Sequence, residues 1–184
     1  MSKSEIISKT SEYFSEKITE HGTTPLGVDW NSVSSQQTRF DQVLKIIDMK
    51  SSFSVNDVGC GYGQFYDYLV KKEFVDFKYF GVDISKEMID AANLIHNDKS
   101  SVKFLRVKSL LEMPLSDFSL ASGVFNMKLE VSNEKWKEYI IESIHDINDR
   151  SSKGFSFNML TSYSDSDKMR DDLYYGDPCF FFDY

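Results

Sequence analysis

The sequence predicts an α/β fold in which helices cover both faces of a doubly wound, mostly parallel sheet. Two observations carry this prediction. Strand-like and helix-like segments alternate along most of the 184 residues. The first predicted strand also runs directly into a glycine-rich turn, Gly59-Cys60-Gly61-Tyr62-Gly63, that opens a helix. Because right-handed crossovers connect such units, their strands are parallel and their turns share one edge of the sheet.

Two helices are expected before the first strand, in a region that spans residues 1–50. The first covers 5–20, is capped by Gly22, and carries on its apolar face Ile7, Phe14 and Ile18. A loop rich in turn-forming residues follows. The second helix has an apolar face made of Val33, Phe40, Val43, Leu44 and Ile47. We expect this region to fold over the edge of the sheet as a lid.

The predicted core, residues 51–160, holds the strands and the helices that alternate with them. The strands are 53–58, 78–83, 102–107, 120–125 and 154–160. The helices are 64–72, then 86–96 with Met88, Ala92 and Ile95 inward, and a third marked by Trp136, Ile140, Ile144 and Ile147. Residues 161–184 follow on the substrate side, and their aromatic end predicts that they dock. Without an internal repeat or a linker, 1–184 is expected to be one domain.

The glycine turn indicates a nucleotide site. Gly59 and Gly61 let the backbone approach a ligand closely, and Gly63 opens a helix whose first amides face the same place. The second strand ends in Asp83, where a carboxylate that binds ribose is expected. The glycines run G-x-G-x-G behind Asp57, which would repel a phosphate. A cationic, phosphate-free nucleotide therefore fits better than a dinucleotide.

These two motifs, Asp57 to Gly63 and Gly81 to Ser85, resemble motif I and the following acidic strand end of class I S-adenosylmethionine-dependent methyltransferases. The resemblance implies a Rossmann-like fold, a methyltransferase activity, S-adenosylmethionine as cofactor and S-adenosylhomocysteine as product. Because few residues follow the fifth strand, the antiparallel hairpin that usually ends such folds is expected to be short or missing. Most of the chain also resembles a bacterial group associated with surface-polysaccharide gene clusters.

The resemblance assigns the cofactor contacts residue by residue. Asp83 would accept the ribose hydroxyls, and Asp57 would order the turn or meet the ligand's ammonium group. Ser109 stands where the family often has an acid that receives the adenine amino group. The full set of expected cofactor contacts is Asp57, Gly59, Cys60, Gly61, Gly63, Asp83, Ile84, Ser109, Leu110, Ser122 and Asn126. For Asn126 a simple turn-forming role, and for Asp57 acceptance of loop amides, are equally open alternatives.

The acceptor is expected to be a small polar molecule, a sugar or a sugar nucleotide, held outside the shared core. Substrate contacts are expected from Trp30, Arg39, Tyr163 and Tyr175. Candidates for a catalytic base are His21, Asp29, Tyr163 and Asp165. Arg39 could also pair with the cofactor carboxylate, or simply with Asp29 or Asp41, and Trp30 could be a packing aromatic instead.

Composition excludes several other classes. A net charge of −8 argues against a nucleic-acid surface, as does the absence of an Asn-Pro-Pro-Tyr tetrapeptide after the fourth strand. No apolar run approaches the ~20 residues of a membrane span, and the polar start lacks a signal-peptide core, so a cytoplasmic protein is expected. Two unpaired cysteines and three scattered histidines predict neither a disulfide nor a metal site.

Two further functions stay open at this point. One is a shortened, inactive cofactor-binding module that acts with a partner, which the short C-terminal segment favours. The other is an enzyme that uses the decarboxylated cofactor, as aminopropyl transferases do. The same short end leaves a sheet edge to be covered, and a homodimer is one arrangement that covers it.

Overall fold

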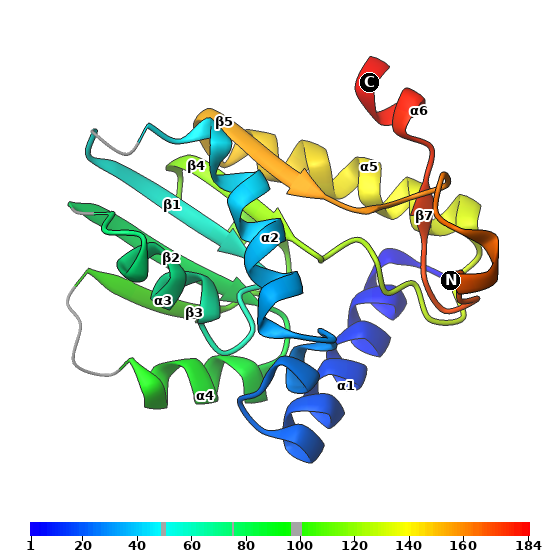
Figure 1. Ribbon diagram of the computed structural model, residues 1–184, viewed down its shortest axis with the longest axis horizontal. Coiled ribbons are helices and arrows are strands. Elements are labelled where there is room, and N and C mark those ends of the chain that lie inside the picture. Colours follow the sequence, from blue (N-terminus) through cyan, green and yellow to red (C-terminus); the bar gives the residue numbers. More distant parts are fainter. Residues whose placement is uncertain (49–50, 75, 97–100) are drawn as a thin grey trace.

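A five-stranded parallel sheet forms the centre of the protein (Figure 1). The structure is a computed structural model and describes residues 1–48, 51–74, 76–96 and 101–184, so the expected boundary at residue 50 lies outside the described residues. The strand order is β3-β2-β1-β4-β5. The strands are β1 (Phe53–Val58), β2 (Phe77–Asp83), β3 (Val102–Arg106), β4 (Ser116–Ser122) and β5 (Ser151–Asn158). The order reverses between β1 and β4, and open α/β sheets bind ligands at such a point.

Helices cover both faces of this sheet, as the sequence predicts (Figure 1). They are α1 (Lys3–His21), α2 (Val33–Val43), α3 (Gln64–Lys71), α4 (Lys86–Ile95), α5 (Asn133–Asp149) and the short α6 (Pro178–Asp183). One buried apolar cluster joins α2, α3 and α4 to β1, β2 and β3. A second cluster joins α5 to the opposite face, and Ile6 of α1 belongs to it.

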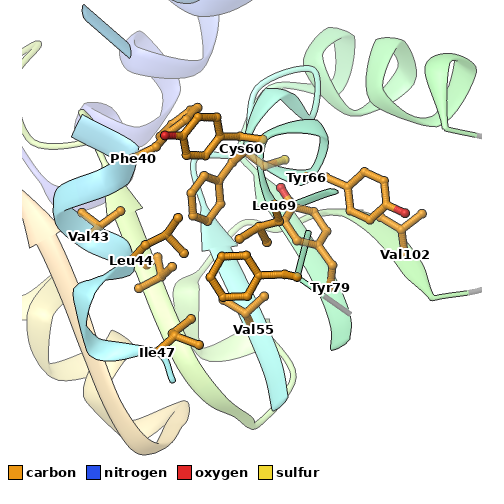
Figure 2. Close-up of a cluster of buried hydrophobic side chains, with 14 of the residues drawn as sticks. Phe40, Val43, Leu44, Ile47, Val55, Cys60, Tyr66, Leu69, Tyr79 and Val102 are labelled. Atoms are coloured by element: carbon orange, nitrogen blue, oxygen red, sulfur yellow. The ribbon is translucent and has the colours of Figure 1, made fainter. Parts of the chain in front are cut away.

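The cluster around α2 and α3 supports the glycine turn from below (Figure 2). Phe40 of α2 packs 4.7 Å, between ring centroids, from Phe65 at the start of α3. Cys60, inside the turn, is buried in the same cluster as Leu69. Burying side chains of this size contributes about 1.5–3 kcal/mol each. The core therefore holds the turn between β1 and α3 in place.

Local signals in the sequence explain why the helices begin where they do. Ser2 and Glu5 form a capping box at the start of α1, and Gly22 ends this helix with a φ of 63°. Ser85 and Ser132 cap α4 and α5 with their side-chain oxygens. Such caps typically contribute about 1 kcal/mol. They replace hydrogen bonds that the first turn of a helix lacks.

The bounds of β4 and β5 differ from the prediction. Both strands begin earlier, at Ser116 and Ser151, in stretches whose serines are typical of loops. Asn56 of β1 accounts for this difference, because its Oδ1 accepts from Ser116 and its Nδ2 donates to Ser119 Oγ. A polar strand start is stable in the interior when its hydroxyls are bonded in this way.

Two helical details were also wrong. Ile95, expected inward on α4, is 45% exposed, and Val33, expected on the apolar face of α2, is 47% exposed. Val33 is the first residue of its helix and Ile95 the last of its helix, so each lies beyond the length of helix that the sheet covers. The inward residues Met88 and Ala92, and the whole Trp136 to Ile147 stripe, are buried as predicted.

After β5 the described chain adds only a small two-stranded parallel sheet, β6 (Leu160–Thr161) with β7 (Tyr175–Gly176), and then α6. This agrees with a short or missing C-terminal hairpin. Phe181 of α6 docks 6.3 Å, between ring centroids, from Phe157 of β5, whereas Phe182 is 90% exposed. Among the described residues, no helix is long and apolar enough to cross a membrane.

Candidate functional site

A cavity of about 250 Å³ opens where the carboxyl ends of β1, β2 and β4 meet. Its floor comes from the glycine turn after β1 and from the ends of β2 and β4. Its outer wall comes from α1, α2 and the loop between them. The side chains and backbone that face one another across it include Asp29, Trp30, Gln36, Arg39, Asp57, Gly59, Gly61, Tyr62, Asp83, Leu110, Gly123, Asn126, Tyr139, Arg170 and Leu173.

The glycine turn needs glycine at the positions that line the cavity. Gly59 and Gly61 have φ of 71° and 55°, which side chains rarely adopt. A Cβ on Gly59 would lie 2.7 Å from Val124 Cγ2, and one on Gly61 would lie 2.8 Å from Val28 Cγ1. The amides of Gly59 and Cys60 both donate to the Val82 carbonyl, at 2.8 and 3.1 Å. The turn is thus fixed to β2 and keeps a bare backbone surface toward the cavity.

Asp83 at the end of β2 completes this floor. Its Oδ2 accepts from the Gly61 amide at 3.0 Å, and its Oδ1 accepts from the Ser85 amide at 2.9 Å. Burial raises the pKa of Asp83, and these amide hydrogen bonds partly offset the rise. Each carboxylate oxygen keeps a further lone pair, so Asp83 has the capacity to accept two more hydrogen bonds from a ligand.

Asp57 lies deeper, with 4% of its surface exposed. Its Oδ2 accepts a hydrogen bond from the hydroxyl of Tyr79, a fully buried residue of β2. Burial raises the pKa of Asp57 to about 7, although the Tyr79 hydrogen bond opposes the rise and the Asp83 charge adds to it. The predicted alternative, acceptance of loop amides by Asp57, is wrong, because the hydrogen-bond partner of its side chain is a phenol.

The outer wall is built around Trp30 and Arg39. The Trp30 ring packs against Gly123, where a Cβ would lie 2.7 Å from Trp30 Cζ2. The guanidinium of Arg39 stacks over the same ring, 4.8 Å from a ring centroid. Asp29 lines the wall in a left-handed conformation with φ 58° and pairs with Lys17 at 3.3 Å. The predicted pairing of Arg39 with Asp29 or Asp41 is wrong, because these carboxylates pair with Lys17 and Lys72 instead.

The end of β4 contributes two of the expected contacts. Ser122 Oγ accepts from Asn158 Nδ2 at 3.1 Å. Asn126 Oδ1 accepts from the Leu160 amide at 3.0 Å, and its carbonyl accepts from the Tyr174 amide at 2.7 Å. Asn126 therefore ties the loop after β4 to the C-terminal segment and also lines the cavity.

Most of the expected cofactor contacts lie together in this cavity. They are Asp57, Gly59, Cys60, Gly61, Asp83, Ile84, Leu110, Ser122 and Asn126. Gly63 and Ser109 lie outside its lining. Gly63 caps α3 with a φ of 92°, and Ser109 Oγ caps a short 3₁₀ turn by accepting from the Leu111 amide. Both residues therefore shape the backbone next to the cavity and do not line the cavity itself.

Only some of the residues expected to contact the acceptor or to act as a base lie at the cavity. Asp29, Trp30 and Arg39 line the cavity, whereas His21, Tyr163, Asp165 and Tyr175 do not. Tyr163 is 75% exposed and lies beside Cys179, because the loop after β6 turns it outward. The Tyr175 hydroxyl accepts from the Arg170 amide. The C-terminal segment nevertheless reaches the cavity, through Arg170 and Leu173.

Sequence reasoning missed several residues of the site. The sequence predicts Tyr79 only as part of β2. A tyrosine in a strand that neighbours the strand of Asp57 is nevertheless a signal for a buried tyrosine–carboxylate pair. Gln36 and Tyr62 line the cavity and are buried. Burial, with a contribution from Asp67, raises the pKa of Tyr62 to about 12. Within the described ranges, no three His, Cys, Asp or Glu side chains gather so as to hold a metal ion.

Comparisons with known proteins agree with this geometry. Residues 55–147, which run from β1 into α5, match the methyltransferase domain family. A Mycobacterium tuberculosis (strain ATCC 25618 / H37Rv) protein, whose name carries an inferred methyltransferase activity, is 43% identical over 140 residues. This alignment covers 76% of the present chain and 82% of the relative.

Solved structures share the fold. The magnesium protoporphyrin IX methyltransferase of Synechocystis PCC 6803, solved with bound S-adenosylmethionine, superposes with a TM-score of 0.65 at 14% identity, over 98% of this chain and 83% of that one. The N-methyltransferase NodS of Bradyrhizobium japonicum WM9, in complex with S-adenosylhomocysteine, gives 0.59 at 16% identity, over 80% and 71%. The chain therefore belongs to the methyltransferase domain family, and its fold is that of the class I S-adenosylmethionine-dependent methyltransferases.

Proposed function

We propose that the protein transfers the methyl group of S-adenosylmethionine to a small polar acceptor, a sugar or a sugar nucleotide. The observation that carries the proposal is the floor of the cavity. There a bare glycine turn lies beside two carboxylates, the buried Asp57 and the half-buried Asp83, and the Gly61 amide bonds Asp83 to the turn. This floor favours a nucleoside with positive charge and no phosphate.

The residues present fit such a cofactor. Asp83 would hold the ribose hydroxyls with its free lone pairs, next to Ile84. The flat backbone at Gly59 and Gly61 leaves room that any side chain would fill. Leu110 would border the adenine, since Ser109 lies outside the cavity. Ser122 and Asn126 would border the methionine part, where Asn126 Nδ2 donates to no other described residue.

The outer wall supports a polar acceptor. Hydroxyl, amide and carboxylate groups line it beside the aromatic Trp30. The buried Oε1 of Gln36 has no hydrogen-bond partner among the described residues, so a ligand hydroxyl or amine would complete it. Mixtures of aromatic and hydrogen-bonding groups of this kind suit sugars.

S-adenosylmethionine supplies a methyl group on a positively charged sulfur. The protein's part is to align the acceptor with that group and to exclude water, for which the lid formed by α1, α2 and their loop is placed. A hydroxyl acceptor also needs a base. Asp29 is the proposed base, because it lines the cavity while the other candidates, His21, Tyr163 and Asp165, lie outside it.

Calorimetry with the purified chain tests the cofactor. We expect S-adenosylmethionine or S-adenosylhomocysteine to bind with a dissociation constant in the micromolar range or below, and NAD to bind far more weakly, because the carboxylates at the floor, Asp83 above all, disfavour its pyrophosphate. Binding of NAD without binding of either methionine derivative would contradict the proposal. Transfer of isotope-labelled methyl groups to a panel of sugars and sugar nucleotides, with nucleic acid as the comparison substrate, then tests the acceptor.

A further inference from the structure

One charged side chain of the cavity has no part in the function proposed above. Arg39 lines the outer wall from α2 and is half-buried. Its Nη1 donates to the Ser35 hydroxyl at 2.6 Å and to the Ser35 carbonyl at 3.2 Å, and its plane stacks on Trp30. These contacts hold the guanidinium but use only one of its nitrogens. Nε and Nη2 donate to no other residue in the part of the chain that the structure describes.

No described carboxylate neutralises this guanidinium. Asp29 pairs with Lys17, and Asp41 pairs with Lys72 at 2.9 Å. Burial lowers the pKa of Arg39, and no neighbouring acid opposes that effect. Charged groups are rarely buried without a partner, because desolvation of a charge costs free energy that an opposite charge offsets. The free donors Nε and Nη2 are therefore available to bind an anion.

The second arginine of the cavity provides an internal comparison. Arg170 also lines the cavity, but its Nε and Nη2 form a two-pronged pair with Asp172, at 3.0 and 2.5 Å. The donors of Arg170 that correspond to the free donors of Arg39 are thus already satisfied. Of these two arginines, only Arg39 offers a free fork toward a ligand.

We propose that Arg39 binds a carboxylate or phosphate group of a ligand held in the cavity. This inference rests on the proposed function and names the chemistry of one of its contacts. The guanidinium fork matches the two oxygens of either group. Two sources supply such a group: the carboxylate of the cofactor's methionine part, or an anionic group on the acceptor, such as the phosphate of a sugar nucleotide. Arg39 lines the same cavity as Asn126, proposed to border the cofactor's methionine part, and as Gln36, proposed to face the acceptor.

The first arm of the test compares S-adenosylmethionine with its decarboxylated form by calorimetry. The proteins are the parent, Arg39→Gln, Arg39→Lys and the control Lys45→Gln, whose exposed side chain lies just beyond α2 and outside the cavity. If the cofactor carboxylate is the partner, Arg39→Gln should weaken S-adenosylmethionine binding about 10- to 100-fold. The decarboxylated form should bind the parent and Arg39→Gln equally. Arg39→Lys should be intermediate, because it keeps the charge and loses the fork.

The second arm titrates inorganic phosphate into each protein, with and without saturating S-adenosylmethionine, and follows the emission of Trp30. If the acceptor supplies the anion, phosphate should bind the parent and Lys45→Gln but not Arg39→Gln, while cofactor affinity stays unchanged. Equal binding of all probes by the parent and Arg39→Gln overturns the inference and leaves the proposed function intact. Absence of any cofactor binding by the parent overturns the proposed function. In that case the phosphate titration without cofactor still shows whether Arg39 binds an anion. If Arg39→Gln does not fold, Arg39→Lys carries the same comparison.

Discussion

At the scale of single residues, the site shows how position changes what a carboxylate does. Asp57 and Asp83 both lie at the glycine turn, yet their partners differ. Asp83 accepts two backbone amides, which favour its ionised form, whereas Asp57 accepts one phenol hydroxyl in a fully buried position. The difference follows from their places in the fold: Asp57 lies inside β1, where the Tyr79 hydroxyl of β2 bonds it, whereas Asp83 is the last residue of β2, next to the amides of Gly61 and Ser85.

The ionisation of Asp57 should make stability depend on pH. Its pKa is about 7 in the folded chain, against an ordinary value of 3.8, so the folded chain holds a proton there that the unfolded chain loses. Stability from this group is therefore complete below about pH 4 and decreases as pH rises to about 7, by up to about 1.4 kcal/mol per pH unit. Asp57→Asn, which resembles the protonated acid, should remove this slope.

Urea denaturation between pH 4 and 8 measures the effect. Tyr79→Phe is the informative partner variant, because it removes the hydrogen bond that opposes the rise in pKa and should extend the slope to higher pH. Asp90→Asn, on the exposed face of α4, is the control and should leave the profile unchanged. Equal slopes in the parent and Asp57→Asn would show that Asp57 ionises normally in the folded state.

How far the sequence predicts the site depends on which contacts are local. The glycines and Asp83 were found because the spacing within one strand-turn-helix-strand unit defines them. Gln36 and Arg170 were missed, because they reach the cavity through contacts between distant segments that no spacing records, and Tyr79 was missed because it acts from the core through Asp57. Tyr163 and Asp165 were expected at the cavity from their position after β5, but the backbone turns away through β6 before reaching them.

At the scale of elements, one contact ties the loop before α2 to the end of β4. Gly123 follows β4 with a φ of 81°, and its missing side chain leaves the space that the Trp30 ring fills. The Gly123 amide also donates to Asn158 Oδ1 of β5 at 2.8 Å. The end of β4 is therefore tied to β5 on one side and to the loop before α2 on the other.

Gly123→Ala should disturb the contact between the Trp30 ring and the end of β4. A left-handed alanine costs about 1–2 kcal/mol, and the new methyl group would also displace Trp30. We expect Gly123→Ala to lower the free energy of unfolding by more than the cost of the backbone conformation alone, and to shift the tryptophan emission because the Trp30 ring moves.

A double-mutant cycle isolates the contact itself. In a Trp30→Ala background the clash is absent, so the cost of Gly123→Ala should fall to the ~1–2 kcal/mol of the left-handed backbone alone. Urea denaturation of the four proteins gives the coupling energy. If Gly123→Ala lowers the free energy of unfolding by the same amount with and without the Trp30 ring, the ring makes no stabilising contact with the end of β4.

The same scale shows why element types were easier to predict than element ends. The glycine turn and the apolar stripes of α4 and α5 are local patterns, and they placed β1, α3 and α5 correctly. The starts of β4 and β5 depend on Asn56, a buried amide of a third strand that bonds Ser116 and Ser119. Because this bond joins residues about sixty positions apart, serine content alone favoured a loop there.

At the scale of the whole molecule, the cavity joins the lid to the sheet, so a ligand that fills it should stabilise the entire fold. A ligand that binds only the folded chain at a concentration of 100 times its dissociation constant adds about 2.7 kcal/mol. For a domain of this size that corresponds to a rise in melting temperature of about 5–10 °C. We expect S-adenosylhomocysteine to produce this rise, and NAD at the same concentration to produce almost none.

Asp83→Asn links that whole-molecule effect to the site. Replacing the carboxylate weakens the acceptor of the ribose hydroxyls, at a cost of about 1–3 kcal/mol, or roughly ten- to hundredfold in affinity. At the ligand concentration used for the parent, the stabilisation should then fall to about 1.4 kcal/mol or less, which at least halves the shift in melting temperature. The melting temperature of the ligand-free variant, measured in the same scan, separates this effect from any change in the turn that Asp83 holds. A variant whose melting temperature rises as much as the parent's would show that the ligand binds away from Asp83.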